Sequence, residues 1–264
     1  MIRLVATDLD GTLLNAASDL TPRTRRALIA AMKRGVLISL SSGRMTEAML
    51  PFAEEIGVNA PMILFYGAMI YDHRTGETLY KNALPAALSK RIALRLEELG
   101  VYYQVYPGEG YYCGERINYT KMYESSIRVP CQAVHATLSE WMVGDMVKML
   151  AIGKPERIDE VQSILRAEFP TGAHFMKSRD NFLEIVAEGI DKGVALRALA
   201  SRLGLPMDEV MAFGDGQNDA SMLRAAGTGV AMGNAVKECL DAAQIVAMKN
   251  TEDGVARVLE EMEG

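Results

Sequence analysis

The N-terminal part of the chain alternates between short apolar runs and longer amphipathic segments. The apolar runs predict strands over residues 2–7, 36–40 and 62–65, and the segments between them predict helices over about 22–34 and 45–56. Thr21 and Pro22 are typical of an N-cap and a first helical position, and Gly35 is typical of a helix end. This alternation favours a parallel sheet with crossover helices.

The pattern changes near Leu84 and returns near Asp191. The segment between predicts helices over 86–99 and 155–169, a tyrosine-rich stretch over 101–113, a less regular region up to residue 141, and strands over 146–152, 173–176 and 182–187. The alternation then resumes with a helix over 191–203, a strand over 209–213 and a helix over 220–226. The sequence thus predicts an α/β fold, with a parallel-sheet core made from residues 1–83 and 188–264 and an inserted α+β domain over residues 84–187.

The composition of the 264-residue chain narrows the class of protein. Apolar residues make up 49% and charged residues 23%, which is ordinary for a soluble globular protein and too apolar for a disordered one. The formal net charge of −6 argues against a nucleic-acid partner. We expect a solvated terminal helix in the last 13 residues, which contain five of the acids: Glu252, Asp253, Glu260, Glu261 and Glu263.

The cysteines and the apolar stretches give expectations for the compartment. Cys113, Cys131 and Cys239 are odd in number and lack C-x-x-C spacing, which argues against a disulfide framework or a zinc site and favours a reducing cytosol. The most apolar stretch, residues 61–71, is about half of the roughly 20 residues needed to cross a bilayer. We therefore expect a cytoplasmic protein without a membrane partner, either a monomer or a small homo-oligomer.

Two pairs of aspartates follow predicted buried strands. Asp8 and Asp10 end the first strand, two residues apart, so that on an extended segment their side chains share a face, and Asp215 and Asp219 follow the strand over 209–213. Ligands of open α/β sheets bind at the carboxyl ends of the strands, and clustered carboxylates favour Mg²⁺. Each pair alone fits a simple turn equally well, with Asn218 or Asp219 capping the next helix.

Two further motifs suggest phosphate binding. Ser41-Ser42-Gly43-Arg44 follows the strand over 36–40, where a hydroxyl and backbone N–H groups suit a phosphate oxygen, although an ordinary polar turn is the simpler interpretation of this motif in isolation. Lys192 lies at a predicted helix start, where a cation is unfavourable unless an anion lies between it and the helix. The ordinary alternative is a surface lysine.

The order of these motifs carries more information than any one of them. The chain resembles the haloacid dehalogenase superfamily of phosphohydrolases, and within it the Cof-type branch with a C2-type cap. The matching segments are Thr7–Leu14, Ser42–Arg44, Gly67-Ala68, Phe182–Ile185, Lys192-Gly193, Gly214–Asp219 and Asp253–Ala256. The resemblance implies a Rossmann-like catalytic core, with residues 84–187 as the cap that selects the substrate.

The resemblance also implies roles for the matching residues. Asp8 is implied as the nucleophile that accepts the phosphoryl group as an aspartyl phosphate, and Asp10 as the general acid and base. A Mg²⁺ ion is implied at Asp8, Asp215 and the backbone carbonyl of Asp10, with Asp219 close by. Phosphate contacts are implied for Leu9, Ser42, Gly43, Lys192 and Asn218.

The chain departs from the branch at two positions and adds a tyrosine cluster. Tyr66 precedes Gly67-Ala68 where the branch usually has asparagine, so the branch's substrate contacts there do not carry over directly; Ser42 replaces the common threonine and keeps the hydroxyl. Seven of the ten tyrosines lie between Tyr102 and Tyr123. Aromatic faces with hydroxyl tips suit a sugar or a heteroaromatic phosphate ester, but packing of the cap sheet explains them more simply.

The expected activity is Mg²⁺-dependent hydrolysis of a small phosphorylated metabolite, a sugar phosphate or similar phosphomonoester. A phosphomutase or phosphotransferase, in which a sugar hydroxyl accepts the phosphoryl group, shares the core motifs and stays open. A non-enzymatic phospho-acceptor switch fits less well, because it needs neither Asp10 as an acid nor a large insert.

Overall fold

The computed structural model describes residues 1–262, which form two compact units. The first contains Met1–Arg44, Met49–Tyr80 and the chain from Asp191 onward, and the second contains Met45–Ala48 and Lys81–Ile190. Within residues 1–262, every helix is too short or too polar to span a membrane. Each unit has its own sheet, so the predicted α/β fold with a parallel core and an antiparallel insert is confirmed.

A five-stranded parallel sheet forms the centre of the first unit. Its order is β14-β13-β12-β1-β2, and its strands are β1 (Leu4–Thr7), β2 (Leu37–Leu40), β12 (Val210–Gly214), β13 (Thr228–Ala231) and β14 (Ile245–Val246). Thr7 is in register with Phe213 on one side and with Leu40 on the other. The segments that leave β1, β2 and β12 therefore start side by side at one edge of the sheet.

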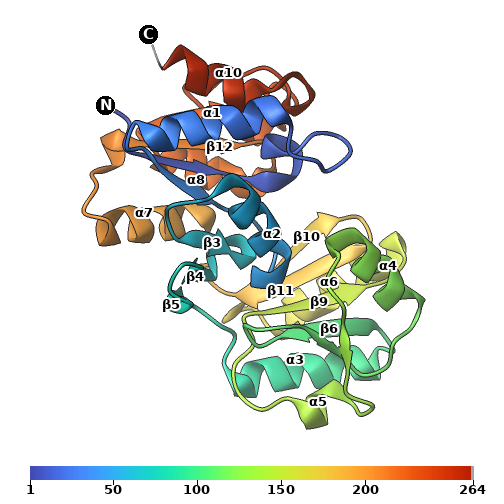
Figure 1. The fold of residues 1–264 in the computed structure, drawn as a ribbon. Helices are drawn as coiled ribbons and strands as arrows, with labels where there is room; N and C mark the ends of the chain where they lie inside the picture. The colour runs from blue at the N-terminus through green and yellow to red at the C-terminus, as the bar shows by residue number, and fades with distance from the viewer. Residues whose placement is uncertain (263–264) are drawn as a thin grey trace. The chain divides into compact units, whose positions relative to one another are not determined.

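Helices cover both faces of this sheet (Figure 1). Helices α1 (Pro22–Lys33) and α10 (Gly254–Glu261) lie on one face, and α7 (Lys192–Arg202) and α8 (Ala220–Ala225) lie on the other. Thr21 caps α1 as predicted, because its side chain accepts the Thr24 N–H. Most of the first unit's other secondary structure consists of α9 (Lys237–Leu240) and a small sheet of β3 (Met62–Leu64), β4 (Met69–Asp72) and β5 (Glu77–Lys81). Helix α2 (Thr46–Ile56) begins in the second unit and continues into the first.

The C-terminal helix α10 corrects one expectation. It is not simply solvated, because one face of it is buried; that face contains Val255, Ala256, Val258 and Leu259. Two of its acids bond to α1: Asp253 accepts the Thr21 hydroxyl, and Glu260 pairs with Arg23. Glu252 and Glu261 are exposed as expected, and Glu263 lies outside the described residues. Helices α1 and α10 are far apart in the sequence, so their packing could not be predicted from local patterns. Because of this packing, the C-terminal segment is part of the core and not only a solvated helix.

A six-stranded sheet forms the second unit. Its order is β10-β11-β9-β6-β7-β8, and its strands are β6 (Tyr102–Tyr106), β7 (Tyr112–Cys113), β8 (Gln132–Ala133), β9 (Lys148–Ile152), β10 (Ala173–Arg179) and β11 (Phe182–Ala187). Neighbouring strands are antiparallel except for β7 and β8, which run parallel. Helices α3 (Ala86–Glu98), α5 (Leu138–Trp141) and α6 (Pro155–Glu168) share a hydrophobic core with one face of the sheet.

Helix α4 (Asn118–Ile127) contacts the sheet through aromatic side chains. The Tyr123 ring meets those of Tyr111 and Phe182, with centroids 5.6 and 5.8 Å apart. The sequence analysis left this helix in the less regular region, because its tyrosine, threonine and serine residues have weak helix propensity. The packing of the Tyr123 ring stabilises the helix where the local propensity of its residues is weak.

The tyrosine cluster belongs largely to the interior of this unit. Tyr103, Tyr106, Tyr111 and Tyr123 are buried. The Tyr106 hydroxyl donates to the Gln104 side chain at 3.0 Å, and the Tyr111 hydroxyl donates to the Val129 carbonyl at 2.9 Å. These contacts support the packing interpretation for the buried members of the cluster.

Candidate active site

The turn after β1 brings Asp8 to the edge of the parallel sheet. Asp8 is the N-cap of the single-turn segment Leu9–Leu13, and it is 6% exposed. Gly11 within this turn has a φ of +83°, and a Cβ added there would lie 2.3 Å from Asp215 Oδ2. Glycine is therefore required both by the left-handed backbone and by the close approach of the loop after β12.

The loop after β12 holds the second pair of aspartates. Asp219 Oδ2 accepts the backbone N–H groups of Asp215 at 3.1 Å and Gly216 at 2.9 Å, as a residue that closes a tight turn does. Asp215 Oδ1 accepts the Thr12 hydroxyl at 2.6 Å. Asp219 therefore closes the turn that precedes it, and although it stands at the N-cap position of α8, its side chain makes no capping hydrogen bond to that helix, so the predicted side-chain cap is not formed.

The other carboxylate oxygen of Asp219, Oδ1, contacts Lys192 in a buried cluster of charged side chains. Lys192 Nζ lies 2.6 Å from Asp8 Oδ1 and 2.5 Å from Asp219 Oδ1, and it donates to the Ser41 carbonyl at 3.1 Å. Asp8, Asp215 and Asp219 each offer a carboxylate oxygen within 4.8 Å of the others. Lys192 is 1% exposed, so it is not a surface lysine. A cation at a helix start is unfavourable without nearby anions, and the carboxylates of Asp8 and Asp219 supply them.

The cluster holds more negative charge than one lysine balances. Burial, together with the charge of Asp219, raises the pKa of Asp8 well above its usual range, although Lys192 opposes this shift. Burial also raises the pKa of Asp215 to about 6; the Thr12 hydrogen bond opposes the shift and the Asp219 charge adds to it. Burial lowers the pKa of Lys192, but Asp219 and Asp8 outweigh it and hold that pKa above the ordinary value. A site of this kind favours a further cation.

The Asp10 carboxylate is held by Arg44. Both of its carboxylate oxygens bond to the Arg44 guanidinium, Oδ2 to Nε at 2.7 Å and Oδ1 to Nη2 at 2.6 Å, and its side chain is 52% exposed. Arg44 also lies over the Phe52 ring, 5.5 Å from its centroid. Arg44 belongs to the predicted Ser42–Arg44 motif, but no role was predicted for its side chain.

The loop after β2 places Ser42 and Gly43 beside Tyr66. Ser42 is 2% exposed, its N–H donates to the Ile63 carbonyl at 2.9 Å, and its hydroxyl oxygen accepts the Arg44 N–H at 3.2 Å. Tyr66 has a φ of +62°, and a Cβ added to Gly43 would lie 2.2 Å from its Cζ. The tyrosine that replaces the branch's asparagine therefore lays its ring against Gly43.

Leu9 and Asn218 complete the set of predicted residues. Leu9 is buried and its carbonyl accepts the Leu14 N–H at 2.9 Å, whereas Asn218 is exposed. Asn234, which the sequence analysis did not identify, donates its side-chain amide to the Gly11 carbonyl at 2.8 Å. No motif signals Asn234, because its partner is more than two hundred residues away in the chain.

Replacing Gly11 with alanine tests the fit between the two loops. The new Cβ displaces the Asp215 carboxylate, and a displacement of about 1 Å at a reacting site lowers activity by about 10²-fold. We expect that loss in kcat/KM for phosphate release, with a stability loss of about 1–2 kcal/mol from the left-handed backbone. Gly35→Ala is the control, because Gly35 has a φ of +89° with nothing within 4 Å. Equal activity of the two variants contradicts the prediction.

Comparisons with known proteins agree with this site. The profile of a family described as haloacid dehalogenase-like hydrolase matches residues 5–259. Phosphatase YwpJ of Bacillus subtilis is 28% identical over 285 residues, covering 99% of this chain and 100% of that protein. A solved haloacid dehalogenase-like hydrolase from Bacteroides thetaiotaomicron has a TM-score of 0.93 at 29% identity, covering 99% and 100% of the two chains. A solved sugar phosphatase of HAD subclass IIB has a TM-score of 0.84 at 25% identity, covering 99% of both.

These matches extend over nearly the whole chain and therefore include both units and every motif that the sequence analysis singled out. Two of these three relatives are named phosphatases, and in this chain the carboxylates of Asp8, Asp215 and Asp219 cluster where β1 and β12 end. The chain is a phosphatase, and it belongs to the haloacid dehalogenase-like hydrolase family.

Proposed function

We propose that the chain is a Mg²⁺-dependent phosphatase that hydrolyses small phosphomonoesters through an aspartyl phosphate on Asp8. The observation that carries this proposal is the buried cluster of Asp8, Asp215 and Asp219 around Lys192. A carboxylate nucleophile beside a lysine and two further carboxylates suits the transfer of a phosphoryl group in two steps.

The donor set of the cluster fits Mg²⁺. It consists of carboxylate oxygens alone, the chemistry that this ion prefers. Burial, with the nearby charge of Asp219, raises the pKa values of Asp8 and Asp215, and a bound cation would favour their charged forms. Asp8 and Asp215 would hold the ion, with the Asp10 carbonyl and Asp219 completing the site. When bound, Mg²⁺ supplies positive charge that reduces the repulsion between the nucleophile and a phosphate dianion.

The chain's own residues then divide the reaction between them. Lys192 fixes the Asp8 carboxylate by its bond to Oδ1, so that an Asp8 oxygen forms the bond to phosphorus while the bond to the leaving oxygen breaks. Asp10 gives its proton to the leaving oxygen and then takes one from the water that releases phosphate. Both Asp10 oxygens accept from Arg44 in the structure, so this ion pair must open before Asp10 carries the proton. Ser42, Lys192, Asn218 and the backbone of Leu9 and Gly43 bind the phosphate oxygens.

The proposal assigns residues 1–83 and 188–264 to the catalytic core and residues 84–187 to a cap that selects the substrate. We propose a sugar phosphate or a similar metabolite as substrate, which the 25% identity to a sugar phosphatase over 99% of the chain supports. We place the enzyme in the cytoplasm, where its three free thiols are compatible with a reducing environment.

A panel of phosphorylated metabolites with Mg²⁺, scored by released phosphate, tests the activity. With labelled substrate and an acid quench, we expect the label on the tryptic peptide of residues 4–23, which contains Asp8. Isomerised monophosphate from a sugar bisphosphate, in place of free phosphate, favours the phosphomutase alternative. A long-lived label without turnover favours the phospho-acceptor switch.

Removal of the metal is expected to make stability depend on pH. The folded-state pKa of Asp215 is raised to about 6, mainly by burial, so its proton stabilises the metal-free fold below the unfolded pKa, and this stability is lost as pH rises through about 6. The groups that face it are Thr12, Asp219, Lys192 and Asp10. In a chelator, the wild-type Tm should therefore fall between pH 5 and pH 7.5 more than that of Asp215→Asn.

Adding Mg²⁺ at pH 7.5 should restore the stability that the metal-free protein loses at this pH, since an ion at 100 times its Kd contributes about 2.7 kcal/mol. At pH 5 the gain should be smaller, because protons compete for the same oxygens. Thermal unfolding of both proteins at the two pH values, with chelator or with Mg²⁺, measures this. A wild-type Tm that does not respond to Mg²⁺ at pH 7.5 contradicts the metal assignment.

A further inference from the structure

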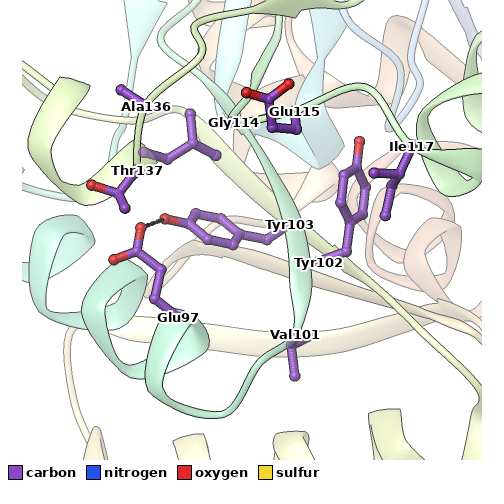
Figure 2. A pocket seen from close by; sticks show the side chains of 10 residues that line it. Glu97, Val101, Tyr102, Tyr103, Gly114, Glu115, Ile117, Ala136 and Thr137 are labelled. Carbon is purple, nitrogen blue, oxygen red and sulfur yellow. Dashed lines mark hydrogen bonds between the residues drawn. The ribbon is translucent and has the colours of Figure 1, made fainter.

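Two tyrosines of the predicted cluster line a cavity in the second unit, but their hydroxyls bond within that unit. Tyr102 and Tyr103 form part of the wall of this cavity, which has a volume of about 200 Å³ (Figure 2). The Tyr103 hydroxyl donates to Glu97 at 2.6 Å, and the Tyr102 hydroxyl bonds to that of Thr120 at 2.7 Å. These contacts explain both tyrosines without a substrate. A different tyrosine, Tyr66 of the first unit, lies beside a residue predicted to bind phosphate.

Three successive residues after β3 have a left-handed backbone. The φ angles of Phe65, Tyr66 and Gly67 are +51°, +62° and +103°. Residues other than glycine rarely adopt this conformation, and asparagine adopts it more readily than an aromatic residue does. The branch's usual asparagine would therefore suit position 66 better than the tyrosine of this chain. An unfavourable backbone conformation beside a functional site points to a role for the side chain that it carries.

Neighbouring segments of the first unit hold this turn in place. The Phe65 side chain is fully buried, and the Tyr66 N–H donates to the Ser42 carbonyl at 3.1 Å. A Cβ added to Gly67 would lie 2.6 Å from the Asp191 carbonyl oxygen. The turn is therefore fixed between the loop after β2 and the residue that precedes α7, so the direction of the Tyr66 side chain is set by its surroundings.

The Tyr66 ring lies directly over Gly43. A Cβ added to Gly43 would lie 2.7 Å from the Tyr66 hydroxyl oxygen, and closer still to the ring carbon that bears it. Tyr66 is only partly buried, so some of its surface stays accessible. The backbone of Gly43 is among the groups proposed to bind the phosphate, and the ring therefore stands beside the proposed phosphate site.

The residue after Gly43 holds the proposed general acid. Arg44 bonds to both carboxylate oxygens of Asp10, the group proposed to protonate the leaving oxygen. Two consecutive residues of one loop thus contact the Tyr66 ring and the Asp10 carboxylate. A leaving group whose oxygen takes a proton from Asp10 begins near this loop, where the Tyr66 ring offers it an apolar surface.

We propose that Tyr66 contacts the leaving group of the substrate and selects phosphomonoesters in which this group contains a ring. This preference rests on the proposed phosphatase activity and narrows the substrate class of the same site. The flat apolar face of a tyrosine packs against another aromatic ring or against the C–H face of a sugar ring. A short acyclic leaving group covers less of that face. Sugar 1-phosphates and aryl phosphates are therefore preferred to acyclic esters.

Tyr66→Asn tests the ring contact with a residue that suits the left-handed backbone. The value of kcat/KM is measured with Mg²⁺ for glucose 1-phosphate and phenyl phosphate, with glycerol 3-phosphate as the acyclic reference. At least one ring ester should lose about tenfold or more, mainly through KM, and glycerol 3-phosphate less than about threefold. The ester with the larger loss distinguishes a sugar from an aryl leaving group. Equal losses for all three esters, or no loss, overturn the proposal, since a uniform loss means that Tyr66 only supports Gly43.

Tyr66→Phe separates the ring from its hydroxyl. Because the ring remains, the preference for ring esters should fall by less than about threefold. A fall as large as that of Tyr66→Asn contradicts the ring as the contacting surface. Thermal unfolding of both variants verifies that they fold.

Phosphonate analogues of the same three esters separate this preference from the proposed activity. A methylene group replaces the bridging oxygen, so that binding is measured by calorimetry without hydrolysis. At least one ring analogue should bind the wild type about tenfold or more tightly than Tyr66→Asn, and the acyclic analogue should bind both alike. A wild-type protein that releases no phosphate from any ester counts against the proposed function, while the analogues still test Tyr66. Equal affinities of the two proteins for both ring analogues refute the role of Tyr66.

Discussion

Asp8→Asn is expected to lower kcat for phosphate release by at least about 10⁴-fold, since removal of a covalent nucleophile leaves only binding and electrostatic contributions. The fold should survive, because burial and the charge of Asp219 raise the pKa of Asp8, which means that a charged group at this position costs the metal-free fold stability that a neutral group does not. We therefore expect a Tm in chelator at least equal to that of the wild type. Thermal unfolding and a continuous phosphate assay measure the two properties separately.

The control for Asp8→Asn is Asp19→Asn, which removes the same charge from an exposed position in the same part of the chain. It should leave both kcat and Tm close to the wild-type values. Mg²⁺-dependent hydrolysis of an aryl phosphate at a wild-type rate by Asp8→Asn would remove Asp8 from the role of nucleophile. A fall in activity that accompanies unfolding would be seen in the Tm and is not the expected result.

Lys192→Met is expected to destabilise the fold by about 3–5 kcal/mol at neutral pH, the usual range when one partner of a buried ion pair is removed. Lys192 is the cation that contacts both Asp8 and Asp219, and its side chain is fully buried. Methionine has a similar volume, so the loss reflects charge rather than a cavity. Because the folded pKa of Lys192 is raised, the wild-type benefit is fully present at neutral pH and is lost only as pH rises through that pKa.

Two further measurements separate charge from packing for Lys192→Met. The difference from the wild type should be smaller at pH 5 than at neutral pH, because the pKa of Asp8 is raised and its protonation removes a charge that the lysine balanced. Lys237→Met removes a lysine that is 81% exposed and pairs with Asp241, and it should change stability by less than about 0.5 kcal/mol. Urea unfolding at both pH values gives these numbers. A Lys192→Met protein as stable as the wild type at neutral pH contradicts the charge balance described above.

Local signals predicted the elements that lie near the active site. The helix cap at Thr21, the apolar run that became β1 and the glycine-rich turn after β12 each depend on neighbours within a few residues. Helix α4 escaped prediction because its Tyr123 contacts rings outside the helix, and local propensity carries no information about such contacts. The prediction of a solvated terminal helix was wrong for a similar reason, since α10 packs its apolar face against α1.

In the active site too, local motifs predicted which residues take part, whereas one contact between distant residues was not predicted. Motifs named Asp8, Asp215, Asp219 and Lys192 as a group, and the structure brings them together. No motif indicated that Asp10 would turn to Arg44, 34 residues away.

The sequence by itself determined the alternation of strand and helix, the aspartates at strand ends and the family to which the chain belongs. These depend on residue type and short spacing, which the chain carries in linear form. The tertiary structure alone decided that Lys192 lies between Asp8 and Asp219, which are 184 and 27 residues away from it in the chain. The physical reason is that strand register and helix packing set distances between residues far apart in the chain, and the strength and sign of their interactions follow from burial at those distances.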